Sequence, residues 1–147
     1  MKYKHGEIYL DKDINVKKIE ERLRVYISTN TKKTAYEELL IEKLELLIKK
    51  VQDILEMYPL DMTLNINVYK TQEQLDEVYF QITGKHKKNC ERAFYVFKNK
   101  TVYITEKKFT VEILAHEIAH SVTNHYFKKL IPIKIKELMS QYVERNL

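Results

Sequence analysis

Two histidines and a glutamate stand within one five-residue segment, His116-Glu117-Ile118-Ala119-His120. On a helix, histidines four positions apart project from one face and can contact a single metal ion. Neutral imidazole is a good zinc ligand, and a catalytic zinc site keeps a position for a water whose pKa the metal lowers toward about 7. Glu117 can reach that water without being a ligand, as a general base and then a proton donor to the leaving amine. The segment therefore predicts zinc-dependent hydrolysis.

The residues around this segment are mostly apolar, which indicates a buried helix. Two histidines and a glutamate inside a buried helix are costly unless they have partners, and a metal ion provides them. We therefore favour a metal site over a surface helix that carries two unrelated histidines. The apolar positions are Val111, Leu114, Ala115, Ile118, Ala119 and Val122.

The third zinc ligand has three candidates. His125 lies nine positions after His116, so on a continuous helix, at about 100° per residue, it lies roughly opposite His116. It turns toward the metal only if the helix breaks early, and the helix dipole alone favours a histidine near a helix C-terminus. Glu137 lies early in the last expected helix, after a turn that lets the two helices lie side by side. We favour Glu137, with His125 still open and Glu144 a weaker candidate.

The composition indicates one folded, soluble domain over residues 1–147, with 44% apolar and 32% charged residues. Cys90 is the only cysteine, so we expect no disulfide and a reducing compartment. Its thiol could bind zinc in a latent form, but we leave it outside the site. The sequence has no signal-peptide or transmembrane pattern, so a cytoplasmic location is the default expectation.

The net charge of +5 comes mostly from scattered lysines, and only residues 85–88 form a dense basic cluster. Such a cluster can attract phosphates, but no nucleic-acid-binding motif accompanies it and arginine is scarce. We expect a peptide or protein substrate, and neither nucleic acid nor a membrane as partner. The sequence indicates no oligomeric state.

Hydrophobic periodicity and turn residues predict an α+β fold. A small sheet containing a hairpin would cover one side of two carboxy-terminal helices, which bear the motif and the third ligand. We expect a mostly helical portion over residues 1–60, with long helices, and a catalytic core over 61–147. The expected strands are 7–10, 62–68, 93–97 and 101–105, and the expected helices are 15–27, 34–57, 71–82, 110–124 and 132–145.

The motif residues resemble a known group. His116-Glu117-Ile118-Ala119-His120 is the zincin signature, and Glu137-Leu138-Met139-Ser140 resembles the gluzincin pattern of a glutamate ligand followed three residues later by Ser, Ala or Asp. The chain is most similar to the minimal gluzincins, compact zinc peptidases of bacteria and phages, over about residues 93–144. Lys136 departs from the pattern, because asparagine often precedes the glutamate there.

The resemblance implies His116, His120 and Glu137 as zinc ligands and Glu117 as catalytic base of a zinc metallopeptidase. It also implies that Phe94, Tyr95 and Val96 belong to an edge strand that pairs with an extended peptide substrate; the alternative is an ordinary core strand.

Stabilising the oxyanion in the transition state usually needs a further group. The candidates are Tyr142 and His125, ranked together, and Tyr126. A second hypothesis is a non-catalytic zinc-containing binding module on the same scaffold. A third is an accidental motif, with nucleic acid bound at residues 85–88.

Overall fold

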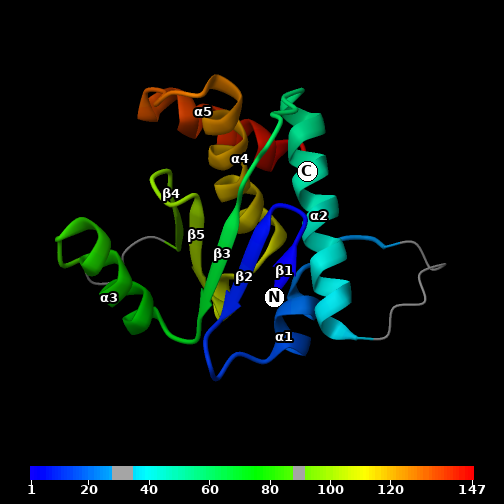
Figure 1. Cartoon of the computed structure of the whole chain (residues 1–147), viewed down its shortest axis with the longest axis vertical. Helices are drawn as coiled ribbons and strands as arrows, with labels where there is room; N and C mark the ends of the chain where they lie inside the picture. The colour runs from blue at the N-terminus through cyan, green and yellow to red at the C-terminus, as the bar shows by residue number, and fades with distance from the viewer. Residues whose placement is uncertain (28–34, 88–91) are drawn as a thin grey trace.

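A single twisted sheet runs through the centre of the chain (Figure 1). The structure is a computed structural model, and it describes residues 1–27, 35–87 and 92–147. Over that part of the chain the sheet order is β1-β2-β3-β5-β4. The three inner strands are parallel to one another, and the two outer strands are antiparallel to their neighbours. The strands are β1 (Lys2–Tyr3), β2 (Gly6–Leu10), β3 (Asn65–Tyr69), β4 (Ala93–Val96) and β5 (Thr101–Thr105).

Helices cover both faces of the sheet (Figure 1). On one face, α3 (Gln72–Thr83) encloses a small cluster around Leu75, Phe94 and Tyr103. On the other face, α1 (Val16–Arg22), α2 (Tyr36–Leu55) and α4 (Val111–Phe127) enclose the main apolar core with the sheet. The last helix, α5 (Ile133–Arg145), packs along α4 and also contacts α2. The mixed sheet and the helices confirm the α+β class.

The expectation of long amino-terminal helices is wrong for the first helix. The helix α1 has only seven residues, whereas α2 has 20. Residues 1–60 also contribute β1 and β2 to the sheet, where β2 lies beside β3. Gly6 allows this close approach: a Cβ there would lie 2.6 Å from Asn65 Oδ1 and 2.7 Å from Leu64 O. A side chain at position 6 would push the two strands apart.

The expected hairpin and the two carboxy-terminal helices are confirmed. Thr110 caps α4 by accepting a hydrogen bond from Ile113 N–H, as its sequence position predicts. The helix continues to Phe127, one turn beyond the expected end near Asn124. Pro132 is the N-cap of α5 rather than its first helical residue. None of the described helices combines the length and apolar character needed to cross a membrane.

Candidate metal centre

The structure brings together two histidines of α4 and one glutamate of α5. His116 Nε2 lies 3.1 Å from one carboxylate oxygen of Glu137, and His120 Nε2 lies 3.1 Å from the other. The two imidazole rings stand nearly perpendicular, with centroids 5.0 Å apart. The Glu137 side chain is 45% exposed, so the cluster is reachable from solvent. The carboxylate favoured in sequence thus meets both histidines.

The other nitrogen of each histidine has its own oxygen partner on α5. Glu144 Oε1 lies 2.9 Å from His116 Nδ1. Ser140 Oγ donates to the His116 carbonyl at 3.0 Å and lies 3.3 Å from His120 Nδ1. Because the serine proton is used on the carbonyl, its oxygen accepts from Nδ1–H of His120. A carboxylate can only accept, so His116 Nδ1 also carries the proton. When each histidine holds this single ring proton on Nδ1, both Nε2 atoms carry a lone pair.

One face of α5 supplies all three oxygen partners. Glu137, Ser140 and Glu144 are spaced three and four residues apart, the spacing that aligns side chains along one side of a helix. Val143 lies on the same side and is fully buried, which fixes this side of α5 against its neighbours. The packing of α5 along α4 thus determines the geometry of the cluster.

Glu117 lies within the same group of side chains, although it comes from the adjacent position on α4. Its carboxylate and ligand atoms of His116 and His120 all lie within 4.8 Å of one another. The residue is only 5% exposed, because α4 turns this side toward β4 and the core. Burial, and secondly the neighbouring His116, lower the pKa of His120 to about 4. His120 is therefore neutral near pH 7, as a metal ligand must be.

His125 is not part of the cluster. Its Nδ1 lies 2.7 Å from the Ser121 carbonyl, and its Nε2 accepts from Thr63 N–H at 3.2 Å. Both ring nitrogens therefore connect the end of α4 to itself and to the segment before β3. The helix does not break before residue 127, so His125 stays on the side away from His116, as helix geometry indicates. The structure thus does not bring His125 to the cluster, as a ligand or as an oxyanion partner.

Tyr142 is also outside the cluster. It stands two positions after Ser140, about 200° around the helix, and it is 49% exposed. Its side chain therefore points away from α4. Tyr126 is likewise 49% exposed and packs edge-to-face on Phe127. The structure thus supplies no contact between either tyrosine and the histidines.

The strand expected to bind substrate is an edge strand. In the described part of the chain β4 pairs only with β5, so its other side has unpaired backbone groups. Its side chains alternate between two surroundings: Phe94 and Val96 pack in the α3 cluster, and Tyr95 packs against the main core. Burial raises the pKa of Tyr95. The side chains of Phe94, Tyr95 and Val96 are thus engaged with the fold, and the strand's backbone edge is what remains for a ligand.

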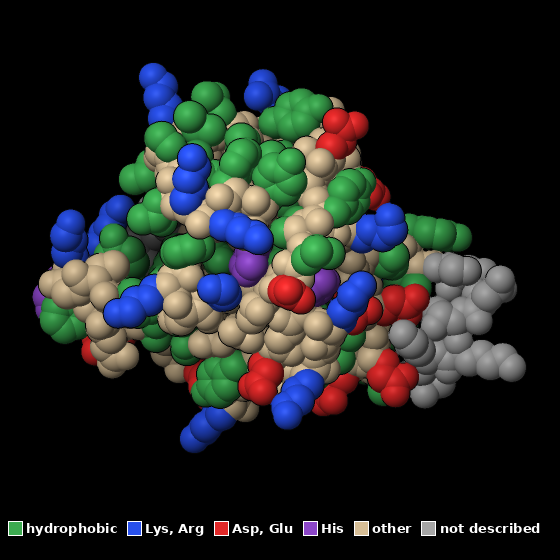
Figure 2. All heavy atoms as spheres, turned by 45° about the horizontal axis from the view of Figure 1, so that its top comes forward, with side chains coloured by type: hydrophobic (Ala, Val, Ile, Leu, Met, Phe, Trp, Pro, Cys, Tyr) green, Lys and Arg blue, Asp and Glu red, His purple; other side chains and the backbone are tan. Residues whose placement is uncertain are grey.

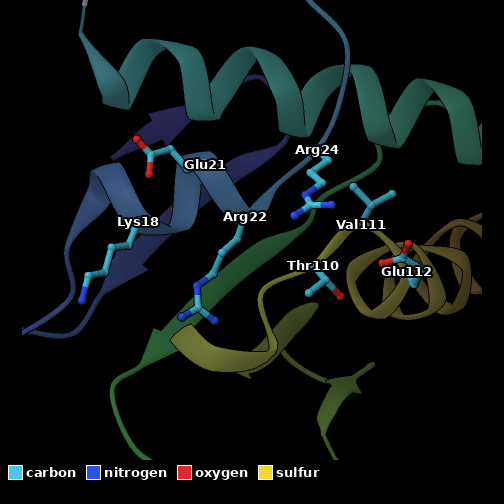
Figure 3. Close-up of a pocket in the computed structure, with 7 residues that line it drawn as sticks. All are labelled: Lys18, Glu21, Arg22, Arg24, Thr110, Val111 and Glu112. Carbon is cyan, nitrogen blue, oxygen red and sulfur yellow. The ribbon is translucent and has the colours of Figure 1, made fainter.

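One cavity lies at each end of α4, and none of the residues that line these two cavities belongs to the cluster. One, of about 550 Å³, lies between α1 and the start of α4 (Figure 3). Lysine and arginine side chains line this cavity together with the carboxylates of Glu21 and Glu112. Arg22 donates hydrogen bonds to the Glu106 and Lys107 carbonyls. The other, of about 510 Å³, lies at the end of α4.

The basic cluster of residues 85–88 is described only as far as Lys87. His86 stacks on Phe80 with ring centroids 3.8 Å apart. Three acidic residues of α3, Glu73, Asp76 and Glu77, line a cavity together with His86 and Lys87. The charge at this surface is therefore mixed rather than uniformly basic. Cys90 lies outside the described residues.

Comparison with known protein families, with curated proteins and with solved structures finds no match to this chain. The function must therefore be argued from the cluster itself. Two partners were not assigned from sequence: Ser140 on His120, and Glu144 on the Nδ1 side of His116 rather than on the metal side. The spacing of these residues from Glu137 along one helix face is the signal that could have identified them.

Proposed function

We propose that the chain is a zinc-dependent metallopeptidase of the zincin type. The observation that carries the proposal is the convergence of three acceptor groups. With Nδ1 of each histidine protonated, both Nε2 atoms carry a lone pair and lie 3.1 Å from the carboxylate of Glu137. Acceptors at that distance repel one another unless a cation or proton lies between them. A metal ion bound by His116, His120 and Glu137 removes this repulsion.

The donor set fits zinc. Two imidazoles and one carboxylate, with a position left for water, form one of the usual catalytic zinc sites. Ligand atoms around a tetrahedral zinc ion lie about 3.3 Å apart, close to the 3.1 Å separations found here. Glu144 and Ser140 supply the outer hydrogen bonds that orient metal-binding histidines. When bound, zinc would supply a water that ionises near neutral pH.

Glu117 is the residue suited to proton transfer. It follows His116 directly and its carboxylate lies within the group formed with the two histidines. A carboxylate in this place can accept a proton from the attacking water and deliver it to the leaving amine. Its burial keeps bulk water from competing for that proton. Glu137 differs because its two oxygens already meet the two Nε2 atoms, so we assign it as the ligand.

The edge of β4 that no other described strand pairs with supports a peptide as substrate. An extended peptide can add to a sheet edge through main-chain hydrogen bonds, and α4, which packs under β4, carries the proposed site. Such pairing holds the peptide straight and places its backbone, rather than one particular side chain, beside the reacting groups.

The test combines zinc content with proteolysis of an unfolded protein such as casein. Wild-type chain should bind about one zinc per molecule, the number expected of a single site. Glu117→Gln should keep the zinc and lose about 10²- to 10⁴-fold in cleavage rate, the contribution usual for a general base. Glu112→Gln, an exposed glutamate of the same helix, is the matched control and should behave as wild type.

Two results would overturn the proposal in different ways. Wild-type chain without zinc, even after the metal is added back, would remove the metal site. Bound zinc together with equal cleavage by wild type and Glu117→Gln, or with none by either, would leave the alternative, a zinc-containing binding module.

A further inference from the structure

Large hydrophobic side chains are exposed where α4 passes into α5. Leu130, in the connection between the helices, is 70% exposed, and Ile133, the first residue of α5, is 75% exposed. We define the α4–α5 surface as the exposed hydrophobic residues of this region. They are Tyr126, Phe127, Leu130, Ile133, Ile135 and Leu138. Single exposed aliphatic residues are ordinary, but several exposed apolar residues gathered in one region usually mark an interaction site.

The α4–α5 surface is also basic. From residue 126 to residue 142 the chain has four lysines and one acidic residue, Glu137, which belongs to the metal centre. Lys128, Lys129 and Lys134 are exposed among the hydrophobic side chains. Figure 2 shows the face toward the top of Figure 1, where hydrophobic side chains gather with lysine and arginine side chains around them. An anionic partner therefore complements this surface.

The hydrophobic character extends beyond the two helices. Leu60, which is 89% exposed, lines the cavity at the end of α4 together with Tyr126 and Lys128. Lys100 and Asp61 line the same cavity, so two lysines face one acidic residue there. The segment before β3 thus contributes to the same end of the molecule. Segments distant in sequence combine there into one apolar and basic face.

The combination of exposed aliphatic side chains with lysines distinguishes a lipid bilayer from a bound peptide as the partner. A groove that binds a peptide is concave, whereas Leu130 and Ile133 lie outside the cavity at the end of α4 and are largely exposed. Exposed aliphatic side chains surrounded by lysines are the composition of helices that lie in the interface of an anionic bilayer. The aliphatic groups enter the boundary between headgroups and acyl chains, and the lysines remain with the anionic headgroups. Docking of this kind needs no membrane-spanning helix, although the sequence alone predicted no membrane partner.

We propose that the α4–α5 surface docks on an anionic lipid bilayer. The docking goes beyond the proposed peptidase activity and does not depend on zinc, so the two proposals fail independently. Glu137 lies on the side of α5 that packs along α4, and Leu138 lies on its outward side, so docking leaves the metal centre about one helix diameter, about 10 Å, from the lipid. The substrates then reached are peptide segments at the surface of the bilayer.

The experiment is co-sedimentation of the full chain with vesicles of phosphatidylcholine alone and with added phosphatidylglycerol. The chain should sediment with the anionic vesicles and remain in solution with phosphatidylcholine. Lys128→Gln with Lys129→Gln should weaken binding about thirtyfold, from the usual contribution of two lysines near an anionic surface. Leu130→Ser with Ile133→Ser should weaken it by at least about tenfold, because the apolar area no longer enters the lipid.

Matched controls lie far from the α4–α5 surface. Lys17→Gln with Lys18→Gln changes two exposed lysines of α1, and Tyr9→Ser with Tyr26→Ser changes two exposed aromatic residues. Both should sediment as wild type. Because the substituted side chains are exposed, circular dichroism should show unchanged folding for every variant.

Equal binding to both kinds of vesicle, or equal loss in the control variants, would overturn the proposal. So would a chain that ignores vesicles but forms a dimer that Leu130→Ser with Ile133→Ser dissociates, because the surface would then bind a second copy.

Discussion

The polar and apolar sides of α5 face the opposite way from those of an ordinary surface helix. The side packed along α4 carries Glu137, Ser140 and Glu144, whereas the outward side carries Ile135, Leu138 and Tyr142. A surface helix ordinarily buries its apolar side and exposes its polar side. On α5 the polar side contacts two histidines and the apolar side faces solvent.

This inversion indicates that α5 is held in place for reasons other than burial of apolar area alone. Val143 is the fully buried hydrophobic residue of this helix, and the contacts around it are polar and directional. Buried polar contacts stabilise a structure only when every member is satisfied. A metal ion would satisfy the polar groups on the inner side of α5, and a lipid surface would cover the apolar residues on its outer side. Substitutions on the inner side therefore test the metal centre, and substitutions on the outer side test whether that side takes part in the chemistry.

The largest effect is expected at Glu137 on the inner side. Glu137→Gln removes the anionic ligand but keeps the side-chain shape, so zinc binding should weaken by more than about 100-fold, beyond the range of an outer partner. Competition with a chromogenic chelator measures the affinity. Glu38→Gln, at an exposed position of α2, is the control. Unchanged affinity in Glu137→Gln would remove this residue from the site and return Glu144 to consideration.

A smaller effect is expected at Glu144, which contacts the opposite nitrogen of His116. Glu144→Gln keeps an acceptor for Nδ1–H but loses the charge that makes the imidazole a better ligand. Zinc affinity should fall about 10- to 100-fold, as is usual for the outer partner of a metal-binding histidine. The same chelator assay measures it, and the order of the two variants is the decisive quantity. If Glu144→Gln loses more affinity than Glu137→Gln, the roles assigned to the two carboxylates are reversed.

The sequence predicted the parts of this arrangement that depend on helix periodicity. The four-residue spacing of His116 and His120 and the position of Glu137 early in α5 require only a regular helix. The same geometry indicated that His125 lies away from the motif face. The alternation in β4 is likewise a local property, and it separates Phe94 from Tyr95. The hairpin and the order of the later elements follow from patterns of this kind.

The parts that the sequence did not predict depend on contacts between distant segments. His125 accepts a hydrogen bond from the backbone N–H of Thr63, 62 residues away, and no local sequence pattern predicts that bond. Hydrophobic periodicity also does not predict that β2 pairs with β3, because that pairing depends on packing in the main core, where residues distant in sequence meet. Tyr142 is an oxyanion candidate in the sequence, whereas its angle around α5, about 200° from Ser140, places it outward.

At His125 we expect a change in stability without a change in the site. His125→Ala removes the hydrogen bonds to Thr63 N–H and the Ser121 carbonyl. The free energy of unfolding of the metal-free chain should fall by about 1–2 kcal/mol, as for two ordinary hydrogen bonds. Urea titration measures this, with His86→Ala, an exposed histidine, as the control. Zinc affinity should stay as in wild type; a tenfold loss would show that His125 reaches the metal after all.

The smallest effect is expected at Tyr142, on the outer side of α5. Its hydroxyl points away from α4, so Tyr142→Phe removes nothing that a bound peptide at the metal centre would contact. The cleavage rate should change less than twofold, whereas loss of a group that stabilises the oxyanion costs about 10²- to 10³-fold. The comparison is made at saturating substrate, where the chemical step is best seen. A loss of that size with zinc retained would mean that α5 rotates when substrate binds, and the inner and outer sides described here would then belong to the free chain alone.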